Sequence, residues 1–428
     1  MAIASTLMAA MYLLMVFSVS ELCAALPHAG GFYAYTRSAF GAFAGYFCGI
    51  AVLLEYLITT AAGVYYFGDL AHGYVQAVPT FVWWAVGLVA VVLLNLQGTE
   101  TMLKVTLGIA AAAIALVLLF AFGVLSTGKL DFAMFATATG QGPVGLLAAL
   151  PYAMWWFLAI EAVPLISEEA KDPARDVPKA MTWGMYTLMF LAVVVLVLNT
   201  ALPFGVEEGQ AVTGAAALAL SDQPFDDGMQ LVFGTEGLGA GLALVAGLVG
   251  QLVAYPMNLY ACSRVFFALS RGGYLPQWLS VTNEQRVPAR ATLTAAVLAM
   301  VLVVPFLLKG SGDDAVSVGD AMVTVSVAAA TVTYILVMAS YIRLKTARPH
   351  MPRPYRSPVG LPGAFVGTAL AVLALLACFI EASYRISVLV FVGMMVLASI
   401  YYFAIAQNQL VEESPEEQFA LTEEEAAG

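Results

Sequence analysis

The stretch 153-AMWWFLAIEAVPLISEEAKDP-173 places Glu161 inside an apolar run that suits the interior of a membrane. A charged side chain at such a depth costs at least ~2.5 kcal/mol on insertion scales, so it needs a partner, water or a function. Pro151 and Pro164 bracket this glutamate and weaken the helix on either side of it. The meaning of Glu161 therefore depends on whether the rest of the chain spans a membrane.

The composition answers that question. The chain has 428 residues, of which 61% are hydrophobic and only 11% are charged. Soluble domains carry about 25% charged residues. One globular core cannot hide so much apolar surface from water, so the chain is predicted to be an all-α integral membrane protein in contact with a lipid bilayer.

Apolar runs of about 20 residues, the length needed to cross a bilayer as a helix, define eleven candidate spans. They cover Ile3–Leu26, Phe43–Tyr66, Phe81–Leu96, Val105–Leu125, Val144–Ile166, Met181–Leu202, Leu238–Leu269, Leu293–Leu308, Ala321–Ile342, Leu361–Ile380 and Ile386–Ile405. The alternating pattern of barrel strands is missing from the sequence, so the spans are predicted to be helices. Residues 1–406 form the membrane domain in this interpretation.

The basic residues indicate the orientation of these spans. If the loop after the first span is cytoplasmic, the cytoplasmic loops contain 14 of the 17 Lys and Arg residues. Only Lys129, Lys309 and Arg385 fall outside them. This bias predicts a multi-pass protein of the cell (inner) membrane with a cytoplasmic C-terminus. It also places Met1 outside, which leads us to expect one further helix upstream of Met1; eleven true spans are the alternative.

Other features of the chain exclude several classes of function. The four cysteines lie in or at the edges of spans without paired spacing, so we expect buried thiols rather than disulfides or metal ligands. The acidic residues 407–428 are predicted to form a disordered cytoplasmic tail. The basic residues are explained by topology, so no nucleic acid partner is expected. The sequence also lacks a Walker or HExxH motif, and we expect neither an enzyme nor a bound cofactor or metal.

Four segments resemble the permeases of the amino acid–polyamine–organocation superfamily. They are ELCAALPHAGGFYAYTRSAFG (21–41), WWFLAIEAVPLISEEAKDPARDVPKA (155–180), SRVFFALSRGGYLPQWLSVTNEQRVPARA (263–291) and RPHMPRPYRSP (348–358). Within the superfamily, PYAMWWFLAIEAV followed by EEAKDP is most similar to the ethanolamine permeases. The resemblance implies a leucine-transporter-like inverted-repeat fold in which this chain supplies helices 2–12 of twelve.

The resemblance also implies that the helix containing Glu161 unwinds at the membrane midplane, where its backbone faces a substrate site. The family usually has glycine and an aromatic residue where this chain has Ala159 and Ile160. Trp155, Trp156 and Phe157 are then the candidates for an aromatic gate. For Glu161 three roles stay open: recognition of a substrate ammonium group, transfer of a coupling proton, or capping of the broken helix.

Polar residues on two other helices are further candidates for the substrate site. Glu55 lies in the middle of its span, where it either lines the cavity or bonds neighbouring helices. Gln251, Tyr255 and Asn258 share one helix face by their i, i+4, i+7 spacing, which interhelical hydrogen bonding also explains. Many relatives that work without sodium carry a lysine in the middle of the fifth helix, but here TLGIAAAAIALVLL fills that region. Coupling to a proton, to sodium or to exchange therefore stays open.

The sequence thus predicts a secondary transporter that moves a small amine or amino acid, with ethanolamine as the first candidate, by alternating access. A general amino acid permease is one alternative. An inactive fragment, or a sensor built on the permease fold, is another.

We predict that four basic residues share one face of the membrane and three acidic residues lie on the other. The basic set is Arg37, Lys171, Arg271 and Arg353, and the acidic set is Asp131, Asp226 and Asp313. Single cysteines at these positions, labelled with a membrane-impermeant maleimide in sealed vesicles of known orientation, test the prediction. A basic position that is labelled from the outside would overturn the topology.

Overall fold

Long helices form almost the whole molecule. The computed structural model describes residues 1–28, 30–137, 142–203, 214, 216, 224–304, 318–380 and 382–410. The helices are α1 (Ala2–Ala25), α2 (Phe32–Phe40), α3 (Ala42–Tyr74), α4 (Thr80–Leu96), α5 (Thr99–Thr127), α6 (Gly142–Met154), α7 (Pro173–Thr200), α9 (Pro224–Phe233), α10 (Leu238–Arg271), α11 (Ala289–Val303), α12 (Val318–Ala347), α13 (Gly360–Ala377) and α14 (Ala382–Ala404). Short 3₁₀ segments add η1 (Phe132–Thr137), η2 (Ile160–Glu169), η3 (Gln277–Ser280) and η5 (Ala406–Asn408).

The helices coincide with the predicted spans. Eight of them are long and apolar enough to cross a membrane, and three shorter apolar helices, α4, α6 and α11, fall on the remaining spans. Several run beyond the apolar window that predicted them: α3 continues to Tyr74, and α7 begins at Pro173 rather than near Met181. These helices are longer than the apolar runs because polar residues at a membrane surface can continue a helix as well as apolar residues can. The all-α fold class is confirmed, and the number of eleven crossings stays a prediction.

The first loop, which contains Pro27, Gly30 and Gly31, separates two helices. Helix α1 ends at Ala25, and the short α2 begins only at Phe32. Gly31 has a φ of 49°, in the left-handed region that glycine adopts without strain, and a Cβ there would lie 3.1 Å from Leu165 of η2. Almost all of α2 is buried, where it packs against α3 and α12.

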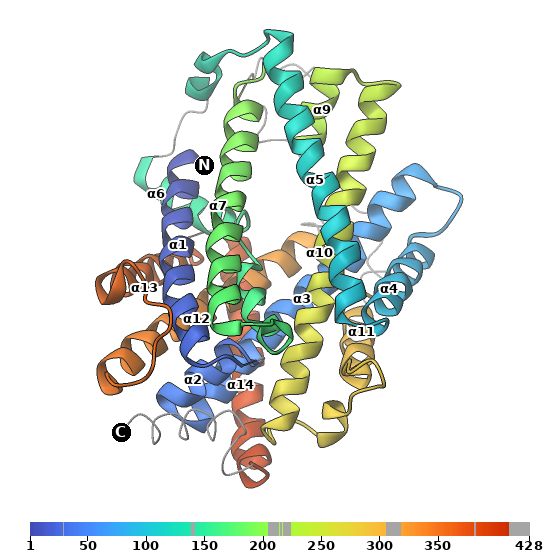
Figure 1. The fold of residues 1–428 in the computed structure, drawn as a ribbon. Helices are drawn as coiled ribbons and strands as arrows, with labels where there is room; N and C mark the ends of the chain where they lie inside the picture. Colours follow the sequence, from blue (N-terminus) through green and yellow to red (C-terminus); the bar gives the residue numbers. More distant parts are fainter. Residues whose placement is uncertain are drawn as a thin grey trace.

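Helix α3 lies at the centre of the packing. It contacts α12, α10, α2, α4 and α11, and 83% of its most apolar window is buried. Helices α5 and α7 are at the periphery, since only 17% and 11% of their windows are buried. Figure 1 shows α1, α5, α7 and α10 as long helices running in broadly similar directions, with the start of α1 in the upper half of the view and the end of α14 at its bottom. Most side chains in the middle of α3 are therefore covered by other helices.

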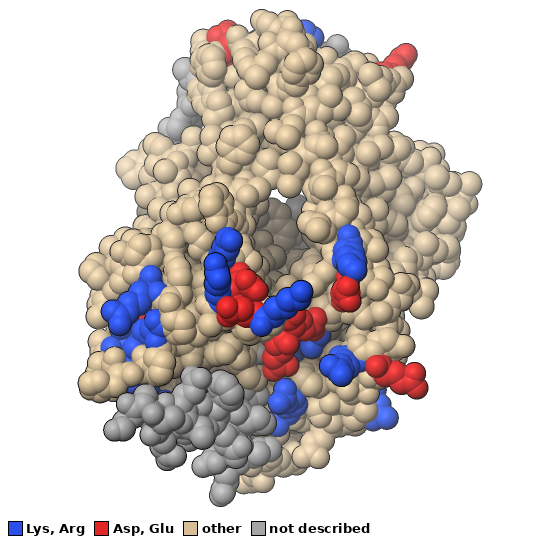
Figure 2. All heavy atoms as spheres, viewed as in Figure 1, with Lys and Arg blue, Asp and Glu red and all other residues tan. Residues whose placement is uncertain are grey.

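Charged residues are unevenly spread over the visible face. Figure 2 shows most Lys and Arg in its lower half, with a wide uncharged surface above them and a few charges at the top. The same face is hollowed near its middle, between the regions of α7 and α10 that Figure 1 identifies. The uncharged surface is what a helix bundle presents to the hydrocarbon of a bilayer.

Two predicted features lie wholly or mostly outside the described residues. The segment Pro203–Gly237, predicted to lie outside, contributes α9. Its Ala- and Leu-rich portion, for which the sequence allows either a short amphipathic helix or a plain surface loop, falls largely outside the described ranges. Of the acidic tail, only the part up to residue 410 is described. All four cysteines are free and buried, as expected.

A buried carboxylate joins the end of α1 to α12 and to the loop before α13. Glu21 is 1% exposed, and its Oε2 accepts hydrogen bonds of 2.8 Å from Tyr341 Oη, Lys345 Nζ and the Ser357 N–H. Its Oε1 lies 3.1 Å from Arg353 Nε. Two cations and two further donors thus replace the water that this carboxylate gives up, which lets a charge remain buried.

We predict that Glu21→Gln destabilises the protein by about 3–5 kcal/mol, because Arg353 and Lys345 lose their shared counter-charge. The measurement is the thermal denaturation midpoint in detergent. The matched control is Glu100→Gln, which breaks an exposed i,i+4 pair with Lys104 at 2.6 Å. Its effect on the denaturation midpoint is expected to be negligible, because solvent screens an exposed pair. Equal losses in the two variants would contradict the role assigned to Glu21.

Candidate functional site

The helix that contains the quoted stretch is interrupted. Helix α6 ends at Met154, residues 155–159 form turns, and η2 begins at Ile160. Ala159 has a φ of 79°, in the left-handed region that costs a residue with a Cβ roughly 1–2 kcal/mol. A regular α-helix cannot pass through this residue. The chain therefore leaves amide and carbonyl groups outside a helical ladder at the position the sequence predicted.

Glu161 stabilises this interruption with one of its two oxygens. The Ala159 N–H donates a hydrogen bond of 3.0 Å to Glu161 Oε1. The side chain is buried, at 3% exposure, and Oε2 has no hydrogen-bond partner among the described residues. The capping role thus has direct geometric support, while the second oxygen stays available for a ligand or a proton.

Glu55 of α3 faces the same carboxylate. It is 1% exposed, and neither of its oxygens has a hydrogen-bond partner within the described part of the chain. It interacts electrostatically with Glu161 and with the thiol of Cys48. Two neighbouring carboxylates in a water-poor interior cannot both keep a negative charge without a cation or a proton to compensate them.

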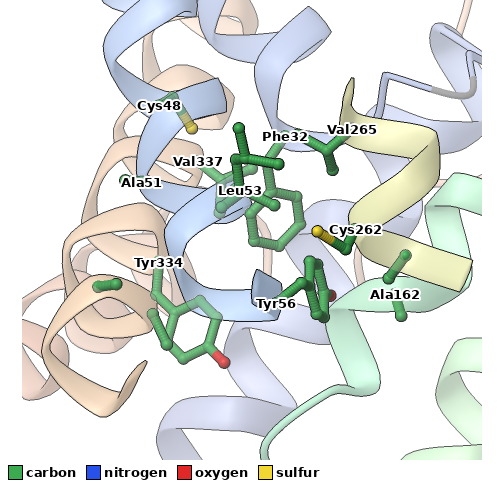
Figure 3. Close-up of a cluster of buried hydrophobic side chains, with 14 of the residues drawn as sticks. Phe32, Cys48, Ala51, Leu53, Tyr56, Ala162, Cys262, Val265, Tyr334 and Val337 are labelled. Carbon is green, nitrogen blue, oxygen red and sulfur yellow. The ribbon is translucent and has the colours of Figure 1, made fainter. Parts of the chain in front are cut away.

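Three tyrosines surround the pair of glutamates. Tyr12 of α1, Tyr56 of α3 and Tyr334 of α12 all interact electrostatically with both carboxylates. Tyr12 Oη donates to Tyr334 Oη at 3.2 Å, and the Tyr56 hydroxyl has no partner in the described residues. Figure 3 shows Tyr56 and Tyr334 in the buried cluster to which η2 contributes Ala162 and α10 contributes Cys262. Hydroxyl groups of this kind offer both donors and acceptors to a small polar ligand.

The structure brings together some of the predicted site residues. Phe157 is 2% exposed, and its ring centroid lies 5.6 Å from that of Tyr12, so it joins the two glutamates in one cluster. Trp155 is 41% exposed and Trp156 is half-buried, which leaves Phe157 as the one fully buried residue among the three candidates for an aromatic gate. Ala159 and Ile160 contribute the turn itself.

The polar stripe of α10 lies elsewhere. Tyr255 is buried, with its hydroxyl unpartnered among described residues, and its ring packs against Gly63 of α3. Gly63 is eight residues from Glu55, or ~12 Å along the helix. Asn258 is 6% exposed and Gln251 is half-buried. No contact with the glutamates is described for these three residues, so their part in the site stays a prediction.

Sequence reasoning passed over two of the tyrosines and gave little weight to the third. Tyr334 stands with Thr324 and Thr331 in the span Ala321–Ile342, where interhelical hydrogen bonding explains the polar side chains equally well. Tyr12 and Tyr56 lie in runs that only predict a span. The signal that was present is the Glu55–Tyr56 pair, since adjacent polar residues in the middle of an apolar helix are uncommon. Which faces meet is a property of the packing.

Ion pairs hold the far end of η2. Glu169 binds Arg264 of α10 and accepts hydrogen bonds from Thr99 Oγ1 at 3.0 Å and Tyr260 Oη at 3.2 Å. Its neighbour Glu168 lies 3.6 Å from both His28 Nε2 and Arg271 Nη1. These contacts tie the end of the interrupted segment to α5, α10 and the α1–α2 loop, on the face predicted to be cytoplasmic.

Comparison with known proteins agrees with this architecture. Residues 1–406 match the amino acid permease family. The chain belongs to the amino acid permease family. The branched-chain amino acid permease BcaP of Bacillus subtilis is 25% identical over 91% of this chain and 82% of its own length. An uncharacterised transporter of Mycobacterium tuberculosis is 24% identical over 69% of this chain.

The alignment with the mycobacterial transporter spans 63% of that relative's length. Among solved structures, a manganese transporter of Eremococcus coleocola superposes with a TM-score of 0.59 at 13% identity, covering 99% of this chain and 88% of that one. At this identity the likeness shows the fold alone. The helix expected upstream of Met1 stays a prediction.

We predict that Ala159→Gly keeps or slightly raises stability, whereas Ala159→Val lowers it by at least ~1 kcal/mol. A β-branched residue at a φ of 79° is a conformational outlier, and glycine is not. Thermal denaturation of both variants in detergent is the measurement. Equal denaturation midpoints for the valine and glycine variants would contradict a left-handed backbone conformation at residue 159.

Proposed function

We propose that this permease is a secondary transporter for a small amine or amino acid that carries an ammonium group, with ethanolamine as the first candidate, and that it works by alternating access. The observation that supports this most strongly is the buried pair Glu55 and Glu161 beside the interrupted segment. Three of their four oxygens have no hydrogen-bond partner among the described residues. A site with surplus negative charge and neighbouring aromatic rings is suited to an organic cation.

In this proposal the two carboxylates have different roles. Glu161 Oε2 receives the substrate ammonium group, because its other oxygen is fixed by the Ala159 amide and the side chain is held in place. Glu55 carries the coupling proton, since it accepts no hydrogen bond from a described residue and needs a proton whenever no cation is bound. Phe157 and Tyr12 close over the site, and Tyr334 orients the Tyr12 hydroxyl.

Alternating access requires that the closed cytoplasmic end opens. The ion pairs of Glu168 and Glu169 with Arg271 and Arg264 are the contacts that would have to separate. Rigid-body movement of the interrupted segment relative to α10 would then expose the glutamate pair to the cytoplasm.

We predict that Glu161→Gln weakens ethanolamine binding 10- to 100-fold, because a charge-assisted hydrogen bond contributes ~1.5–3 kcal/mol. Glu55→Gln is expected to keep binding and exchange while abolishing accumulation driven by a pH gradient. The measurements are radiolabelled ethanolamine binding to purified protein from pH 5 to 9, and uptake into proteoliposomes. Glu100→Gln, an exposed carboxylate variant, is the matched control.

The results separate the open alternatives. Unchanged ethanolamine affinity in Glu161→Gln with a lowered denaturation midpoint would leave Glu161 as a helix cap only. Tight binding of leucine or lysine in place of ethanolamine would favour a general amino acid permease. Transport by an upstream-extended protein but not by this chain would identify the chain as an inactive fragment.

A further inference from the structure

A cavity that opens to the surface lies at the foot of α7, apart from the glutamate site. Its volume is ≈ 490 Å³, and it is bounded by the first turns of α7 and by Pro354 and Tyr355 of the loop before α13. The charged side chains that line it are Asp172, Arg175 and Lys179. Figure 2 shows Lys and Arg next to Asp and Glu in this lower part of the molecule. A cavity of this size can hold a phosphate with its immediate substituents.

The two basic residues of the cavity are not occupied by the protein. Arg175 and Lys179 are exposed, and neither forms an ion pair with any described residue. Arg353, in the same loop as Tyr355, is by contrast held by Glu21. The carboxylate of Asp172 opposes an anion. The main-chain N–H of Asp172 is already hydrogen-bonded to Asp176 Oδ2, at 3.3 Å. The lining therefore keeps an excess of one positive charge.

An exposed apolar stripe continues from the cavity along α7. Trp183 lines the cavity and is 63% exposed, and Tyr186, Phe190 and Val193 follow it at 43%, 58% and 57% exposure. Their i, i+3, i+7, i+10 spacing places all four on one face of the helix. Trp and Tyr concentrate where the hydrocarbon of a bilayer meets its headgroups. The cavity is thus at headgroup level, and the stripe beside it is at the level of acyl chains.

We propose that this cavity binds the phosphate of an anionic phospholipid, whose acyl chain lies along the α7 stripe. Arg175 and Lys179 contact the phosphate, and Trp183 contacts the start of the chain. A free phosphate would contact the two basic residues but leave the apolar stripe on α7 uncovered. A phospholipid contacts both, so we propose a lipid. The proposal is independent of the transported substrate.

Native mass spectrometry of the purified full chain, titrated with lipids of identical acyl chains, tests the proposal. We expect phosphatidylglycerol to bind more tightly than phosphatidylcholine or phosphatidylethanolamine. In the double variant R175Q/K179Q, phosphatidylglycerol affinity should fall about 30-fold, since each basic residue near an anionic headgroup contributes about fivefold. The matched control R286Q/R290Q removes two exposed charges, one from the loop before α11 and one from its first turn, and should bind like the wild type.

Two further measurements distinguish the lipid from other occupants. Trp183→Ala should weaken all diacyl lipids and preserve the preference for phosphatidylglycerol, as contact with an acyl chain requires. Inorganic phosphate at 10 mM should leave bound phosphatidylglycerol in place. Displacement by phosphate, a preference for phosphatidylethanolamine, or an equal loss in R286Q/R290Q would each overturn the proposal.

Discussion

The interruption at Ala159 is the feature on which the rest of this structure depends. A membrane interior has no water to satisfy free amide and carbonyl groups, so a helix can be broken there only where protein surrounds the break. The chain meets this requirement with Glu161, which accepts the Ala159 N–H, and with packing from α1, α3, α10 and α12. The same arrangement leaves one oxygen of the buried Glu161 carboxylate without a hydrogen-bond partner among the described residues.

The stability cost of this site is compensated elsewhere. The glutamate pair is under-satisfied, because three of its oxygens have no hydrogen-bond partner in the described structure. Glu21, also buried, is saturated by two cations and two further donors. Glu21 therefore holds α1 against α12 and the loop before α13, whereas Glu55 and Glu161 retain oxygens without a partner among the described residues. Unused capacity of this kind is common at functional sites and rare in purely structural ones.

The contacts around η2 connect the site to its surroundings. The near end of η2 meets the glutamate pair and the far end is fixed by Glu168 and Glu169 to basic residues of α10 and to His28. A segment anchored by ion pairs at one end and by a strained turn at the other can move as a unit when those contacts change. Helix α7 follows η2 directly in the chain and also carries the cavity proposed to bind lipid. A lipid bound there is therefore connected through α7 to the segment that is proposed to move.

The sequence alone determined the class of this protein and the positions of its helices. Apolar runs that span a bilayer leave few alternatives to a helix, and four motifs in order along the chain placed it among the permeases before any fold was known. The break near residue 159 was also predictable, because Pro151 and Pro164 weaken the helix and the resemblance to the permeases implies an unwound segment at Glu161. Tertiary structure alone decided that Glu55 meets Glu161, that Tyr12 and Tyr334 join them, and that Tyr255 packs on Gly63 instead. A uniformly apolar helix has no polar face to indicate how it is rotated, so its contacts are set only when neighbouring helices pack against it.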